Sequence, residues 1–216
     1  MPSVLGGAKP GLFTELTAED LESEIKTNYM AGMYTAHAAI NLMVASPVQD
    51  PKCRRHIIFT SSVVAFYPIA GYAGYAPAKA ALRSLTDSLR QECILYGIDV
   101  HCCFPATIFT PGFDKENETK NALTKKLEEK DGGQKPDEVA RICIANLEKG
   151  HCLVTTTFIG SALRALTWGG SQRNNYIMDT LFAWFMPLIW WFIGWEIDQD
   201  VRNWKKKNGP FTGPRS

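Results

Sequence analysis

The chain has 216 residues, of which 45% are hydrophobic, and its formal net charge is +1. This length suits one domain with a substantial core, and the near-neutral charge lacks the basic excess of a nucleic-acid-binding protein. The six cysteines form no C-x-x-C pair and the four histidines are scattered, so we expect reduced thiols and no metal site.

The first segment of the chain predicts a strand end, a glycine turn and a long helix. Residues 4–8 have the pattern of a strand that runs into a turn. Thr17 is a typical helix cap, and acidic residues follow it in the first turn. The helix should continue to about Met43, with a break near Gly32.

The middle of the chain predicts a buried strand that ends beside two serines. The apolar run 56–60 is typical of strands in a parallel sheet. Ser61 and Ser62 follow at its carboxyl end, where open α/β sheets place their ligands. A long helix is then expected over residues 75–96.

The second half of the chain continues this alternation of strands and helices. Residues 98–104 predict a strand that Pro105 ends. The polar, charged stretch 111–134 is expected to be a mobile segment or a substrate lid. A helix at 136–150 and a strand at 152–158 complete an α/β fold with a mostly parallel sheet.

The C-terminal part contains an uncharged segment, residues 180–195, that is rich in Trp, Phe, Leu and Ile. It is slightly shorter than the roughly 20 apolar residues of a straight membrane-spanning helix. Its tryptophans are typical of membrane interfaces, and the lysines at 205–207 could contact anionic headgroups. We predict that residues 180–195 associate with a membrane; a buried helix or the packing face of a homo-oligomer is the alternative.

A tyrosine and a lysine on the helix at 75–96 have the spacing of a proton-transfer site. Tyr75 and Lys79 are four residues apart and therefore share one helix face. A lysine ammonium beside a phenol favours the phenolate, which lowers the pKa of the tyrosine. Such a tyrosine can exchange a proton with a carbonyl or alcohol oxygen. Ser62, thirteen residues before Tyr75, could bind the same oxygen, and Ser61 is the alternative.

These residues resemble the pattern of the short-chain dehydrogenase/reductase family, in which Ser62, Tyr75 and Lys79 would form the catalytic set. Asn28 matches the family's helix asparagine. The turn from Pro105 to Thr110 matches its proline turn after the sixth strand, although Ala106 stands where glycine is usual. Gly7 matches the glycine of the family's Asn-Ala-Gly turn. Five such elements occur in order at compatible spacing.

The resemblance implies how the chain is organised. Residues 1–160 would be the C-terminal portion of a partial Rossmann-like, doubly wound parallel sheet. Residues 161–216 would form an apolar, membrane-associated tail with a basic end.

The resemblance also implies the role of each site residue. A nicotinamide would donate hydride to a ketone carbon while Tyr75 protonates the oxygen. Lys79 would lower the tyrosine pKa and bind the nicotinamide ribose, Ser62 would hold the substrate oxygen, and Asn28 would position a water behind Lys79. The cofactor-binding residues would be Tyr75, Lys79, Pro105, Thr107, Ile108 and Thr110. For Thr110, a cap on the following turn is the alternative role.

The run 110–120, together with the apolar segment and its basic end, is similar to the branch of the family that reduces 3-ketosphinganine to sphinganine with NADPH. This similarity implies a long-chain lipid ketone as substrate and a place on the endoplasmic reticulum membrane, with the catalytic face towards the cytosol. One alternative is a membrane-associated reductase of a steroid, retinoid or fatty-acyl ketone. The other is a non-catalytic interaction protein that keeps the fold.

The phosphates of a dinucleotide need a glycine-rich turn between the first strand and the first helix. No GxxxGxG or GxGxxG pattern occurs in the chain. The family would place about three strands and their helices before Met1. We therefore expect the sequence to be part of a longer enzyme and the chain alone to bind NADPH poorly.

Overall fold

The computed structural model describes residues 2–3, 6–46, 53–120, 122–128 and 132–165, together with scattered positions between 177 and 207. The four strands of this part form one parallel sheet in the order β1-β2-β3-β4. They are β1 (Pro2–Ser3), β2 (Arg55–Thr60), β3 (Ile98–Phe104) and β4 (Leu153–Thr155). The predicted α/β class and parallel sheet are confirmed.

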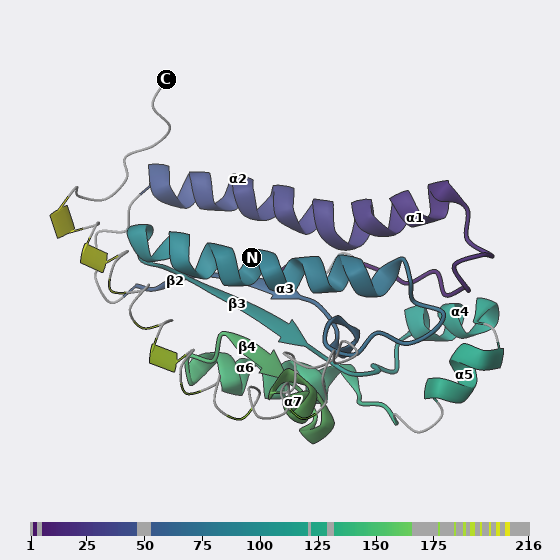
Figure 1. Cartoon of the computed structure of the whole chain (residues 1–216). Helices are drawn as coiled ribbons and strands as arrows, with labels where there is room; N and C mark the ends of the chain where they lie inside the picture. The colour runs from purple at the N-terminus through teal and green to yellow at the C-terminus, as the bar shows by residue number, and fades with distance from the viewer. Residues whose placement is uncertain are drawn as a thin grey trace.

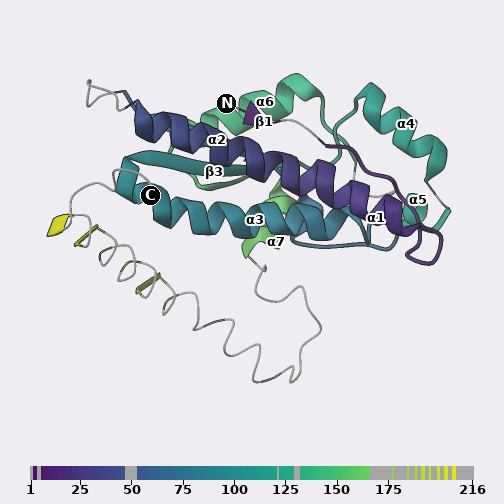
Figure 2. The ribbon, with the colours of Figure 1, turned by 90° about the horizontal axis from the view of Figure 1, so that it is seen from above.

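Helices cover both faces of this sheet (Figure 1). One face carries α1 (Ala18–Ile25), α2 (Ala31–Ala45) and α3 (Tyr75–Glu92), and Figure 2 shows that α3 lies alongside the line of α1 and α2. The other face carries α6 (Pro136–Glu148), which packs on β4, and α7 (Phe158–Ala165) also contacts β4.

The core lies between the sheet and the layer formed by α2 and α3. Its side chains come from β2, β3 and the inner faces of these helices, and the largest are fully buried. They include Ile57, Phe59, Leu82, Val100 and Phe104. The burial of this apolar surface stabilises the packing of the helices on the sheet. Because β2 and β3 are parallel neighbours, their carboxyl ends lie side by side.

The predicted first helix exists, but it contains an unusual turn. Thr17 caps α1 with a full capping box, in which Asp20 also reaches back to the cap. The chain then passes through a π-helical turn at Lys26–Met30 before α2 begins. The predicted break therefore occurs just before Gly32. Gly32 lets the helix approach the core, because a Cβ there would lie 3.3 Å from Leu82.

The predicted helix at 75–96 is α-helical only as far as Glu92. A 3-10 turn over Cys93–Tyr96 tightens its end, and Gly97 closes it in the left-handed conformation with φ of 64°. This conformation favours glycine, which has no Cβ to clash.

The stretch 111–134, predicted as a mobile segment or a substrate lid, contains two helices. They are α4 (Pro111–Thr119) and α5 (Ala122–Glu128). Thr110 caps α4, and a proline occupies its first turn. Whether these helices move as a lid stays a prediction.

Most of the predicted membrane segment 180–195 lies outside the described residues. Within the part of the chain that the structure describes, no helix has the length and hydropathy needed to cross a bilayer. The division at residue 160 and the predicted membrane contact and homo-oligomer stay predictions.

Candidate functional site

A cavity of about 710 Å³ opens at the carboxyl ends of β2 and β3. Its walls come from the glycine turn near the N-terminus, the start of α3, the turn after β3, and helices α4, α5 and α7. Open α/β sheets bind ligands at this edge because the loops that follow the strands converge there.

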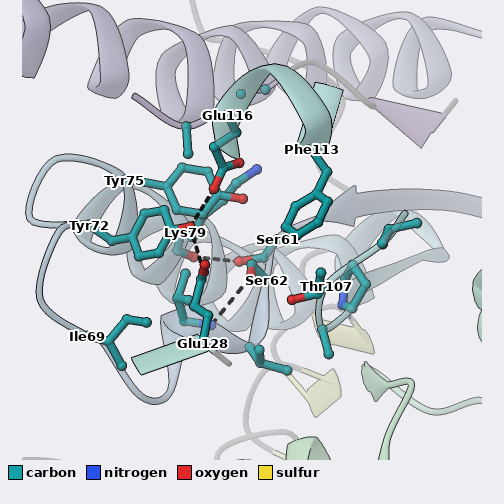
Figure 3. A pocket seen from close by; sticks show the side chains of 18 of the residues that line it. Ser61, Ser62, Ile69, Tyr72, Tyr75, Lys79, Thr107, Phe113, Glu116 and Glu128 are labelled. Carbon is teal, nitrogen blue, oxygen red and sulfur yellow. Dashed lines mark hydrogen bonds between the residues drawn. The ribbon is translucent and has the colours of Figure 1, made fainter. Parts of the chain in front are cut away.

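Tyr75, Lys79 and Ser62 line this cavity together, as predicted (Figure 3). The Nζ atom of Lys79 lies 5.4 Å from the centroid of the Tyr75 ring. The lysine is only 4% exposed, and its ammonium donates to the carbonyl of Thr60 over 3.2 Å. The Ser62 side chain is close enough to the phenol of Tyr75 to lower the pKa of that phenol, and its hydroxyl oxygen accepts from the N–H of Val64 over 3.4 Å.

The structure distinguishes between the two candidate serines. The Ser61 hydroxyl is buried and donates to the backbone carbonyl of Lys79 over 2.8 Å, so it joins the end of β2 to α3. Ser62 is the serine next to the phenol. Ser62 is therefore the residue able to bind a substrate oxygen.

The prediction of an acidified phenol is wrong in this structure. Burial raises the pKa of Tyr75 well above its usual value, and the carboxylates of Glu116 and Glu24 raise it further, while the hydrogen bond with Ser62 opposes the shift. Burial also lowers the pKa of Lys79, and the nearby charge of Glu24 counteracts that change. Tyr75 is thus held in its protonated form, which is the form that gives a proton to a ketone oxygen.

Asn28 lies behind Lys79, on the π-helical turn, and is 2% exposed. Its Nδ2 atom donates to the carbonyl of Gly7 over 2.9 Å and to Glu24 over 2.7 Å. Its buried Oδ1 atom has no hydrogen-bond partner among the described residues. A Cβ on Gly6 would lie 2.6 Å from this oxygen and 3.1 Å from Lys79 Nζ, so only glycine fits there. The predicted asparagine and lysine therefore face the same narrow space.

The four predicted residues of the turn after β3 also line the cavity: Pro105, Thr107, Ile108 and Thr110. Thr110 additionally has the alternative role that was expected of it, because its hydroxyl accepts from the N–H of Phe113 over 3.2 Å and caps α4.

One wall of the cavity carries charged residues that the sequence motifs did not indicate. Tyr72 lies with its ring 5.7 Å from that of Tyr75 (Figure 3), and its single O–H is within hydrogen-bond distance of the carboxylates of Glu116 and, at 2.6 Å, Glu128. The buried ammonium of Lys120 pairs with both carboxylates, at 3.1 Å from Glu116. The spacing of Glu116 and Lys120 predicts their contact on a helix, but no spacing indicates that Tyr72 and Glu128 join them.

Known proteins are similar to this chain in sequence and in fold. The sequence model of the short chain dehydrogenase family matches residues 4–121. A 3-ketodihydrosphingosine reductase of Aspergillus fumigatus is 41% identical over 94% of the chain and 60% of its own length. One from Neurospora crassa is 39% identical over 78% of the chain and 47% of its own length. The chain thus spans about half the length of these curated relatives.

Solved structures agree with the fold at lower identity. A short-chain dehydrogenase from Sphingobium yanoikuyae in complex with NADPH superposes with a TM-score of 0.60 at 21% identity, over 81% of this chain and 66% of that one. One from Burkholderia cenocepacia in complex with NADP gives a TM-score of 0.62 at 17% identity, over 78% and 63%. Together with the sequence match, these findings show that the chain belongs to the short-chain dehydrogenase family.

Proposed function

We propose that this protein is the catalytic portion of an NADPH-dependent reductase that converts 3-ketosphinganine to sphinganine. The main support for ketone reduction is that Ser62, Tyr75 and Lys79 line the same cavity. The substrate is supported by the relatives, which are named 3-ketodihydrosphingosine reductases. NADPH as the cofactor is supported by the short-chain dehydrogenase of similar fold whose structure was solved in complex with NADPH.

The residues of the cavity fit the nicotinamide half of such a cofactor, which supplies hydride when bound. Gly6 leaves space beside Lys79 that a Cβ would fill, and the buried Oδ1 of Asn28 offers an unused acceptor there. Lys79 would hold the ribose, and the turn from Pro105 to Thr110 would lie against the carboxamide.

The side chains of the protein supply the proton that the reduction consumes. The protonated phenol of Tyr75 would give its proton to the ketone oxygen, which becomes the hydroxyl group of the product. Ser62 donates a hydrogen bond to the same oxygen as negative charge develops there. The ammonium of Lys79, 5.4 Å from the centroid of the ring, would stabilise the phenolate left behind. Burial alone disfavours that charge.

The charged wall favours an amino ketone over the alternative substrates. On this wall Glu116 and Glu128 present two carboxylates to the single ammonium of Lys120, while Lys9, Lys79 and Lys115 line other parts of the cavity. 3-Ketosphinganine carries a primary amine next to its ketone, whereas steroid, retinoid and fatty-acyl ketones carry none. A carboxylate near the phenol would hold that ammonium and so place the ketone at the proton donor.

We also propose that the C-terminal part holds the enzyme at the endoplasmic reticulum membrane, with the cavity facing the cytosol. The support is that the described apolar positions of this part are exposed: Trp184, Leu188, Trp191, Phe192 and Trp195. Lys206 and Lys207, also exposed, follow them. A lipid ketone would then be taken up where it is concentrated.

The test compares two ketones in the joined protein, in which this chain replaces its matched part of the Aspergillus fumigatus reductase. We expect NADPH-dependent formation of sphinganine from 3-ketosphinganine, measured by mass spectrometry. The analogue that lacks the amine should have a kcat/KM lower by roughly tenfold or more, as for loss of a charge-assisted hydrogen bond. Equal kcat/KM values for the two ketones would contradict a role of the carboxylates in binding the amine. Failure to form any sphinganine would contradict the proposed activity.

A further inference from the structure

Glu24 is a buried acid that contacts three parts of the site without lining the cavity. It is 5% exposed, at the end of α1. One oxygen accepts from the backbone N–H of Lys9, on the loop that forms the cavity wall, and the other accepts from Asn28 over 2.7 Å. Its side chain also packs on the start of α3, where a Cβ on Gly74 would lie 3.1 Å from its Cγ atom.

The contact with Asn28 sets the direction of the asparagine amide. Both N–H donors of that amide are used, one by Glu24 and one by the carbonyl of Gly7, so Oδ1 must point the other way, towards Gly6 and Lys79. A flipped amide would aim its oxygen at a carboxylate and a carbonyl, and its N–H groups at an ammonium. Both of these contacts would be repulsive, so the Asn28 amide has only one stable orientation.

Charge supports the same role. Burial raises the pKa of Glu24, and the N–H of Lys9, the ammonium of Lys79 and the amide of Asn28 favour its ionised form. In return, the carboxylate of Glu24 opposes the loss of charge that burial imposes on Lys79. The nearby carboxylate of Glu116 acts against ionisation of Glu24.

We propose that Glu24 is a positioning residue of this reductase. Its two oxygens join the Gly6–Lys9 loop to the π-helical turn and hold the Asn28 amide so that Oδ1 faces the ammonium of Lys79. Glu24 is not among the residues that match the family's motifs, and it does not line the cavity. The kinetic part of this inference rests on the proposed function, but the structural part does not.

The kinetic test is a double-mutant cycle in the joined protein. Glu24→Leu should lower kcat by roughly tenfold, the effect of one lost charge-assisted hydrogen bond, and change KM for the ketone less than twofold. If Glu24 acts through Asn28, the same change made in an Asn28→Ala background should cost much less than it does alone. Equal costs in both backgrounds would overturn the proposal.

Two further variants separate positioning from a loss of folding. Glu24→Gln keeps the volume and one acceptor but turns an N–H towards one of the two donors, so its kcat should lie between wild type and Glu24→Leu. Glu22→Leu, on the same helix with an exposed side chain, should keep wild-type kcat. If Glu24→Leu fails to fold, the cycle is run with Glu24→Gln, and additive costs overturn the proposal there as well.

A structural readout needs no activity and uses the full chain itself. The N–H of Lys9 donates to Glu24, so its hydrogen exchange should become roughly tenfold faster in Glu24→Leu and stay unchanged in Glu22→Leu. Unchanged exchange at Lys9 in Glu24→Leu would overturn the proposal. If the joined protein reduces another ketone and no 3-ketosphinganine, the proposed function fails, while the cycle on that ketone still decides the role of Glu24.

Discussion

Tyr75 is the proposed proton donor, and its acidity is set by residues far from it in the sequence. The four-residue spacing to Lys79 and the position of Ser62 were enough to predict that the three side chains meet. They were not enough to predict the pKa, because burial and the charges of Glu116 and Glu24 dominate it. These two acids come from helices on opposite sides of α3 in the sequence, and only the folded chain brings them to the phenol.

This environment predicts how the rate depends on pH. The proton donor is the phenol, which is present below the pKa of Tyr75, and a raised pKa extends the active range upwards. Glu116→Gln removes a negative charge and should lower that pKa, so the alkaline limb of kcat/KM should move to lower pH. The measurement is NADPH oxidation from neutral to alkaline pH in the joined protein.

The control for this titration is Glu118→Gln, which changes an exposed residue of the same helix. It should leave the alkaline limb in place. A limb that Glu116→Gln does not move would show that the carboxylate does not govern the proton donor.

The helices α4 and α5 are held in place by charge rather than by an apolar stripe. The side chain of Lys120 is completely buried and pairs with Glu116 and Glu128, so one ammonium joins the two helices. Sequence reasoning predicted only a mobile segment or a lid there and no helices, because polar helices lack the apolar period that indicates a helix. The α1 cap at Thr17, by contrast, is local chemistry and was predictable. The π-helical turn after it depends on the contacts of Asn28 with other segments and was not.

Lys120→Met should therefore loosen both helices. The change leaves two carboxylates on a half-buried wall without their ammonium, and removing one partner of a buried ion pair costs about 3–5 kcal/mol. We predict faster proteolytic cleavage within residues 111–128 and a higher KM for the ketone. Limited proteolysis and steady-state kinetics measure the two effects.

Lys125→Met provides the matched control, since Lys125 is exposed on α5. It should change neither the cleavage rate nor KM. If Lys120→Met behaves like this control, the ion pairs do not hold the wall in place.

At the scale of the whole molecule, the alternation of strands and helices was sufficient to predict a parallel α/β sheet, and the serine-bearing end of β2 was sufficient to place the site. The helix α7 was missed because the predicted strand at 152–158 took in Phe158, whereas β4 ends at Thr155 and Phe158 begins α7. Its residues Ile159 and Leu163 then contribute to the cavity wall. The C-terminal part adds exposed tryptophans. They support the proposal that the substrate is delivered from a membrane.

Replacing three of these tryptophans tests that proposal. Trp184, Trp191 and Trp195 are exposed, and their amphipathic rings suit a membrane interface. Changing all three to Ser should reduce binding of the full chain to anionic phospholipid vesicles by roughly tenfold or more in a sedimentation assay. Tyr34→Ser alters an exposed aromatic residue on α2 and should leave binding unchanged. Equal vesicle binding by the triple variant and wild type would refute membrane association through this segment.

The most direct test of the reductase account is the rate of sphinganine formation by the Tyr75→Phe variant of the joined protein. Removing one hydroxyl deletes the proton donor and leaves the ring in place, so we predict a fall in kcat of at least about 100-fold with an unchanged unfolding temperature. A variant that keeps most of the wild-type rate would contradict the assignment of Tyr75 as the group that protonates the ketone.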